Sequence, residues 1–197
     1  MTISPRFKPA VSLLRELGIT EPDEIDIEAI AEHCGATVTY GQLTGCAARI
    51  IGVDDKAIIT VNRGPQRGRE RFSAAHELAH WLRDTGDVAL LCNPDRSFDT
   101  SGGGNPETRA NDYAADLLMP KAMFAPRAQG RSLTMQTASD LADIFTTGLT
   151  ATTIRLIELG SFPGVVVVSD AERVRWFRRG PDVPESLWPD RKSTRLN

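Results

Sequence analysis

Apolar residues recur at helical spacing in six stretches of the chain. The longest, Arg69–Arg83, contains neither Gly nor Pro and places Phe72, Ala75, Ala79 and Leu82 on one face. The same spacing, together with residues that favour helix ends, predicts further helices at Pro9–Leu17, Asp26–Cys34, Pro106–Leu118, Thr134–Phe145 and Thr150–Leu159.

Short β-branched segments stand between and after these helices. Three of them, Ala36–Tyr40, Ala47–Val53 and Ala57–Val61, are separated by short turns and predict a small antiparallel sheet. Near the end of the chain, Val165–Val168 and Arg173–Phe177 flank a polar turn and predict a hairpin. The pattern therefore indicates an α+β fold, in which a small antiparallel sheet packs with helices and is followed by a helix-turn-helix-like segment and a C-terminal hairpin.

Two histidines lie four positions apart in the run H-E-L-A-H, as His76 and His80. Residues four apart project from the same face of a helix, so both imidazoles can reach one zinc ion while Glu77 addresses a water on that ion. A catalytic zinc site usually has a third protein ligand and an open fourth position, and Glu107 is the best candidate. An acidic residue in a first helical turn also stabilises the helix dipole, so spacing alone leaves both roles open for Glu107.

Asn111 lies one turn after Glu107 on the same helix face. Its side-chain oxygen could accept a hydrogen bond from the second nitrogen of a ligating histidine and so fix the ring's tautomer and orientation. The alternative is an ordinary polar residue at the edge of the face. Tyr113, in contrast, falls among the apolar positions of this helix, and we expect it to pack in the core.

The segments that carry these residues resemble a known family. The stretches N-R-G-P-Q-R-G-R-E-R-F-S-A-A-H-E-L-A-H-W-L and E-T-R-A-N-D-Y-A-A-D-L-L-M-P are similar to motifs of the ImmA/IrrE family of gluzincin-like metallopeptidases, which process transcriptional repressors in bacteria and their mobile elements. The resemblance implies that His76, His80 and Glu107 bind Zn²⁺ and that Glu77 is catalytic. Tyr113 departs from the family, in which phenylalanine is more common at this position.

The implied reaction is hydrolysis of a peptide bond. Zinc held by two neutral imidazoles and a carboxylate can lower the pKa of its bound water from about 15.7 to about 7. Glu77 would take the proton and pass it to the leaving amine. The resemblance implies that the substrate is a specific intracellular protein, a helix-turn-helix transcriptional repressor, whose cleavage relieves repression in a stress response or in mobile-element control.

The resemblance and the changes of composition along the chain predict that it is divided into three regions. Residues 1–125 would form the zinc metallopeptidase domain, 126–180 the helix-turn-helix-like segment with its hairpin, and 181–197 a loosely ordered tail rich in proline and charge. The polar, glycine-rich stretch 84–105 is expected to be a loop near the cleft, either a lid or a solvated connection.

The helix-turn-helix spacing also permits a different class of function. Its second helix offers only Arg155 and Glu158 as charged residues, and the formal net charge of the chain is -3, so packing is favoured over direct DNA binding. A non-catalytic regulatory protein, or a toxin-antitoxin-type binding protein with a structural zinc, is the remaining alternative.

Composition is typical of a cytoplasmic protein. No run of apolar residues is long enough for a membrane span, and no secretory signal pattern opens the chain. Three cysteines without a C-x-x-C pair make a disulfide framework or a structural zinc knuckle unexpected. The sequence does not set the oligomeric state.

Overall fold

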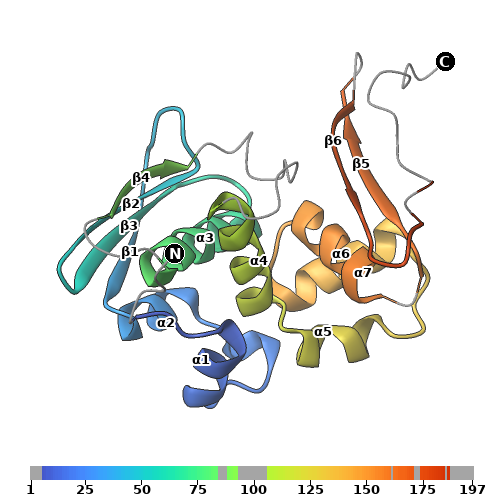
Figure 1. Ribbon diagram of the computed structural model, residues 1–197, viewed down its shortest axis with the longest axis horizontal. Coiled ribbons are helices and arrows are strands. Elements are labelled where there is room, and N and C mark those ends of the chain that lie inside the picture. Colours follow the sequence, from blue (N-terminus) through green and yellow to red (C-terminus); the bar gives the residue numbers. More distant parts are fainter. Residues whose placement is uncertain are drawn as a thin grey trace.

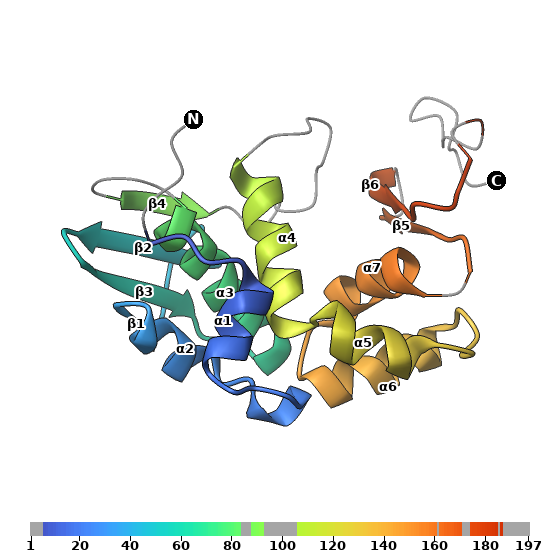
Figure 2. The ribbon, with the colours of Figure 1, turned by 60° about the horizontal axis from the view of Figure 1, so that its bottom comes forward.

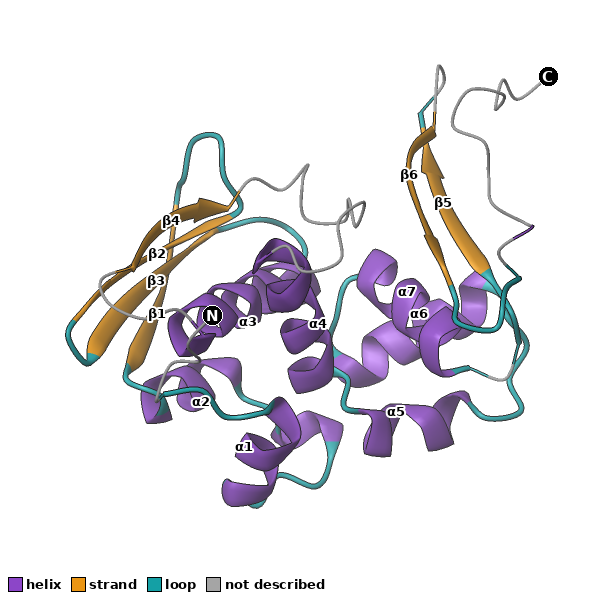
Figure 3. Ribbon diagram, viewed as in Figure 1, coloured by secondary structure: helices purple, strands orange, loops and turns teal. Residues whose placement is uncertain are grey.

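The computed structural model describes residues 6–83, 106–160, 162–170, 174–184 and 186, together with the backbone of 88–92. In this part of the chain the fold is α+β, as predicted (Figures 1 and 3). Its helices are α1 (Ala10–Glu16), the 3-10 helix η1 (Pro22–Glu24), α2 (Ile27–His33), α3 (Arg67–Arg83), α4 (Pro106–Leu118), α5 (Lys121–Ala128), α6 (Met135–Phe145) and α7 (Leu149–Leu159). Its strands are β1 (Ala36–Gly41), β2 (Ala48–Val53), β3 (Lys56–Asn62), β4 (Val88–Cys92), β5 (Val165–Ser169) and β6 (Val174–Arg179).

The larger sheet is mixed, which corrects the prediction that it is antiparallel. Its strand order is β1-β3-β2-β4, and β1 pairs with β3 in parallel, with Val38 opposite Ile59. β2 and β3 form the predicted antiparallel pair, with Ile50 opposite Ile59. The connection from β1 to β2 skips one position in the sheet, and β3 then fills that position between them. β1 therefore pairs with β3 and not with β2. The periodicity identifies strands, but the path of the connection between β1 and β2 decides this order.

β4 corrects a second expectation. The stretch 84–105 was predicted to be a loop, yet Val88–Cys92 forms an edge strand antiparallel to β2. The five residues V-A-L-L-C are apolar, but they lie in a segment that is otherwise polar and rich in glycine, which concealed the strand. The remainder of this stretch, 84–87 and 93–105, lies outside the described residues.

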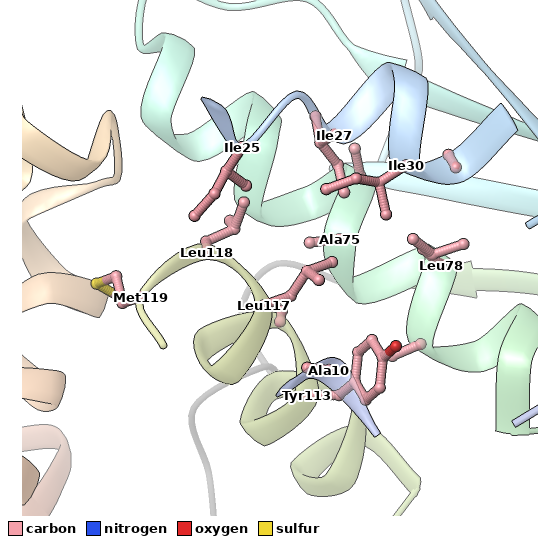
Figure 4. Close-up of a cluster of buried hydrophobic side chains, with 14 of the residues drawn as sticks. Ala10, Ile25, Ile27, Ile30, Ala75, Leu78, Tyr113, Leu117, Leu118 and Met119 are labelled. Atoms are coloured by element: carbon pink, nitrogen blue, oxygen red, sulfur yellow. The ribbon is translucent and has the colours of Figure 1, made fainter. Parts of the chain in front are cut away.

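The main core lies on both sides of α3. One side packs on the sheet, where Ile50, Ile59 and Val61 are buried, and the other packs against α4. Figure 4 shows Leu117 of α4 beside Ala75 of α3, with Ile27 and Ile30 of α2 close by. Alanines at the contact allow the two helix axes to approach closely. The predicted burial of Tyr113 is confirmed, and its hydroxyl donates a hydrogen bond to the Lys8 carbonyl at 3.0 Å.

The helices α5, α6 and α7 lie on the far side of α4 from the sheet (Figure 2). α6 begins at the predicted N-cap Thr134, whose side chain accepts from the Thr137 amide. α7 begins earlier than predicted, because Gly148 rather than Thr150 precedes its first turn. α5 was missed, since it holds Pro126 and starts directly after Pro120. It runs across residue 125, the border proposed from sequence.

The turn between α6 and α7 sits directly on the first turn of α3. A Cβ added at Gly68 would lie 2.3 Å from the carbonyl carbon of Thr147. Three residues further on, buried Arg71 donates to the Phe145 carbonyl at 2.8 Å and to the Thr146 carbonyl at 3.0 Å. α3 and the α6–α7 pair are therefore held in one arrangement.

The described helices include none with the combination of length and apolar composition that crossing a lipid bilayer requires.

Replacing Gly68 by alanine should destabilise the fold, although alanine favours helix by about 1 kcal/mol. The added methyl group must displace the backbone at Thr147, and overpacking of this kind costs about 1–3 kcal/mol. Urea unfolding of Gly68→Ala should give a net loss in the free energy of unfolding. Gly64→Ala is the control, since its Cβ meets nothing within 4 Å. Equal stability of Gly68→Ala and the parent chain would contradict this account of the turn.

Candidate metal centre

Three side chains converge at the contact between α3 and α4. Nε2 of His76 and Nε2 of His80 lie 3.2 Å apart. Oε2 of Glu107 lies 3.2 Å from Nε2 of His76, and its Oε1 lies 3.4 Å from Nε2 of His80. The structure thus brings together the three residues that the sequence singled out, as a group able to hold a metal ion.

Two factors position this group: the spacing of residues along α3 and the packing of α4 against α3. The spacing of four residues places His76 and His80 side by side on α3, within its buried segment. Glu107 comes from the first turn of α4 and reaches the histidines because the apolar faces of the two helices are in contact. The imidazoles are almost fully buried, whereas 34% of the Glu107 side chain is exposed. The group is therefore open on the Glu107 side.

The donor separations fit a small tetrahedral cation. Nitrogen and oxygen ligands at about 2.0–2.1 Å from a tetrahedral ion lie about 3.3–3.4 Å from each other. The two ring nitrogens are 3.2 Å apart, and each lies 3.2 or 3.4 Å from a different oxygen of the Glu107 carboxylate, which is close to this edge length. Two imidazoles and a carboxylate leave the fourth position of such an ion without a protein ligand.

Hydrogen bonds from His76 and His80 hold the pKa of the Glu107 carboxyl well below its ordinary value. The carboxylate therefore stays ionised at neutral pH, which is the form that binds a cation.

Asn111 lies in the position expected for orienting a ligand. Its Oδ1 is 2.8 Å from Nδ1 of His76. A hydrogen bond donated by Nδ1 leaves the Nε2 lone pair directed at the other two donors. The contact is present in the structure, and its part in metal binding remains a prediction.

A cleft of about 1190 Å³ opens over this group, and His76, Glu77 and Asn111 are part of its lining. Glu77, which follows His76 on α3, is fully buried and belongs to this lining. α3 lines one side with Arg69 and Phe72, and the start of α7 lines another with Leu149. This volume is large enough for several residues of a peptide.

No pattern in the sequence indicates that the β5–β6 hairpin reaches the cleft. Val168, Val174 and Trp176 line its far side. They are distant in sequence from H-E-L-A-H and carry no metal-binding chemistry, so no local pattern could have identified them. His33, the remaining histidine, lies in the last turn of α2, with its Nε2 3.4 Å from Oε1 of Glu16, and is not part of the cleft lining.

Comparison with known proteins agrees with this geometry. Residues 31–156 match the family model Peptidase_M78, described as the IrrE N-terminal-like domain, and the chain belongs to this peptidase family. No curated protein matches the chain significantly. Among solved structures, a Mycobacterium tuberculosis transcriptional regulator is similar, with a TM-score of 0.56 and 16% sequence identity over 87% of this chain and 53% of that one. This chain spans about half the length of that regulator, and at this identity the likeness concerns the fold alone.

Asn111 provides a test of how the centre is built. Asn111→Ala removes the acceptor for His76 Nδ1 and should weaken metal binding about 10- to 100-fold. Asn111→Asp retains an acceptor oxygen and should bind nearly as tightly as the parent chain. Zinc titration against a chromophoric chelator measures both affinities.

Two further variants serve as controls for this experiment, one that should lose metal binding and one that should keep it. Glu107→Gln should abolish stoichiometric binding, whereas Asp143→Asn changes a cleft carboxylate outside the metal group and should retain about one ion per chain. Parent-like affinity in Asn111→Ala would show that the contact has no part in orienting the histidine.

Proposed function

We propose that this chain is a zinc-dependent endopeptidase that cleaves a specific intracellular protein, a helix-turn-helix repressor, and so relieves repression. The observation that carries the proposal is the convergence of His76, His80 and Glu107 on one point, next to a cleft whose lining includes His76 and Glu77. Membership of a peptidase family supports hydrolysis as the reaction. The choice of a repressor as substrate rests on the resemblance to the ImmA/IrrE family.

Zinc fits the site, because two imidazoles and one carboxylate are a common donor set for a catalytic zinc ion. When bound there, it would supply a Lewis acid that activates water and polarises the scissile carbonyl.

Asn111 and Glu77 would then have different roles in the reaction. Asn111 would hold the His76 ring with Nε2 turned toward the other two donors. Glu77 receives a proton from the attacking water and returns it to the leaving nitrogen. Burial keeps bulk water away from the Glu77 carboxylate, so proton transfer takes place between positioned partners.

The packing of α7 argues against direct DNA binding. A helix-turn-helix reader places the N-terminal residues of its second helix against base edges. Here those residues, from Gly148 to Ala151, line the cleft above the metal group. Arg155 is buried and bonds to Asp116 at 2.7 Å and to the Met119 carbonyl at 2.9 Å. The first turn of α7 thus faces the cleft, and Arg155, one of its two charged residues, is engaged within the molecule.

Glu77→Gln separates catalysis from binding. The variant should retain about one zinc ion per chain, because Glu77 is not among the three donors, and should lose at least about 10²- to 10⁴-fold of its cleavage rate. The assay incubates zinc-loaded parent and variant chains with helix-turn-helix repressors of the same cell and follows products by mass spectrometry. A repressor-controlled reporter is measured in parallel.

Regulation that persists in Glu77→Gln would contradict the proposal and support the alternative, a binding protein with a structural zinc. Loss of zinc in Glu77→Gln would show that Glu77 is a ligand and not the base.

A further inference from the structure

The far side of the cleft is an apolar surface made by the β5–β6 hairpin. Val168 of β5 and Trp176 of β6 are paired in register, so their side chains lie on the same face of the hairpin. Val174, two residues before Trp176, joins them in lining the cleft. We call these three residues the inner face of the hairpin.

Two other apolar residues of the hairpin point away from the cleft. Side chains alternate along a strand, so Val167 and Phe177, which are also paired in register, lie on the outer face. Neither lines the cleft, and Val167 is 49% exposed. Arg175 also lines the cleft, at the irregularity in the pairing next to Val168 and Ser169. The hairpin thus presents three apolar side chains and one arginine to the cleft, and offers apolar controls on its outer face.

An ionic contact holds the inner face in place. Arg178, two residues after Trp176, donates from Nη2 to Oε1 of Glu158 at 2.8 Å and from Nε to the same oxygen at 3.2 Å. The same Nη2 lies 3.5 Å from Oδ1 of Asp112 on α4. At the base of the hairpin, the Gly180 amide donates to the Gly164 carbonyl at 2.9 Å. The hairpin is thus fixed to α7 and to the helix that supplies Glu107.

Phe72 continues the apolar lining up to the metal group. It lies four residues before His76 on α3 and therefore projects beside it, and it is half-buried in the cleft wall. Leu149, at the start of α7, is 43% exposed and also lines the cleft. A peptide held over the three donors would meet apolar side chains from α3, α7 and the hairpin.

Charged side chains are fewer than apolar ones in the cleft lining, so the lining has less to offer an ionic substrate. Arg175 forms an ion pair with Asp170, and the lining includes one further arginine, Arg69, and one aspartate, Asp143. Apolar side chains left in a cleft gain free energy when a partner removes them from water. The chemistry of the walls thus favours an apolar substrate group.

We propose that the hairpin's inner face, with Trp176 as its largest member, is a specificity subsite that accepts a large aliphatic or aromatic side chain of the peptide near the scissile bond. This inference rests on the proposed function, since the subsite matters only if a peptide lies over the metal group. The helix-turn-helix-like helices and the hairpin then form a substrate-selecting wall of the peptidase.

Two peptide hydroxamates provide the test, because the hydroxamate anchors on zinc and no natural substrate is needed. They share one extended tripeptide backbone and differ only in carrying leucine or glycine side chains. Calorimetry on the zinc-loaded chain should show the leucine probe binding about tenfold or more tightly than the glycine probe. In Trp176→Ala this preference should fall to about threefold or less, with the affinity for the glycine probe unchanged.

The outer face supplies matched controls. Phe177→Ala should keep the full preference, as should Val167→Thr, whereas Val168→Thr, which adds a hydroxyl on the inner face at nearly constant shape, should reduce it. Zinc content and circular dichroism show that each variant is folded.

The outcomes separate the two proposals. Equal binding of both probes by the parent chain, or an undiminished preference in Trp176→Ala, would overturn the subsite and leave the peptidase intact. Failure of the zinc-loaded parent chain to bind either probe would show that the metal has no open position, which overturns the proposed function and the subsite together.

Discussion

The apolar contact between α3 and α4 sets the distance from the two histidines to the glutamate. Ala75 and Leu117 are fully buried at this contact, and small side chains let the helices approach until three donors lie within one coordination sphere. If the helices moved apart by a few ångströms, the ring positions on α3 would be unchanged but Glu107 would no longer reach them. The hydrophobic core is therefore the first determinant of the site, and the polar groups depend on it.

The same helix pair organises the second part of the molecule. Arg71 of α3 binds the carbonyls that end α6, and Asp116 of α4 receives Arg155 of α7. Both guanidinium groups are buried and each is held by more than one acceptor, because a buried charge without partners is costly. This arrangement uses a helix-turn-helix-like unit as one wall of a cleft. Similar spacing of helices can thus serve packing rather than DNA recognition.

Local features of the fold could be predicted from sequence, and features set by distant contacts could not. The pair of His76 and His80 follows from helix geometry alone, whereas Glu107 joins them only through the packing of α4, which is why spacing left its role open. The strands were identified, but the parallel pairing of β1 with β3 depends on the path of the chain between them. Trp176 was missed as a cleft residue because nothing in its neighbourhood marks it as functional. The resemblance of two motifs supplied what periodicity lacked, and the family match supports it.

The most direct measurement is a crystal structure of the zinc-loaded chain with diffraction recorded on both sides of the zinc absorption edge. The account predicts a single anomalous peak about 2.0–2.2 Å from Nε2 of His76, Nε2 of His80 and a carboxylate oxygen of Glu107. It also predicts that the fourth position faces the cleft and holds no protein ligand. A peak elsewhere in the molecule, or a fourth protein ligand that closes the site, would contradict the central claim.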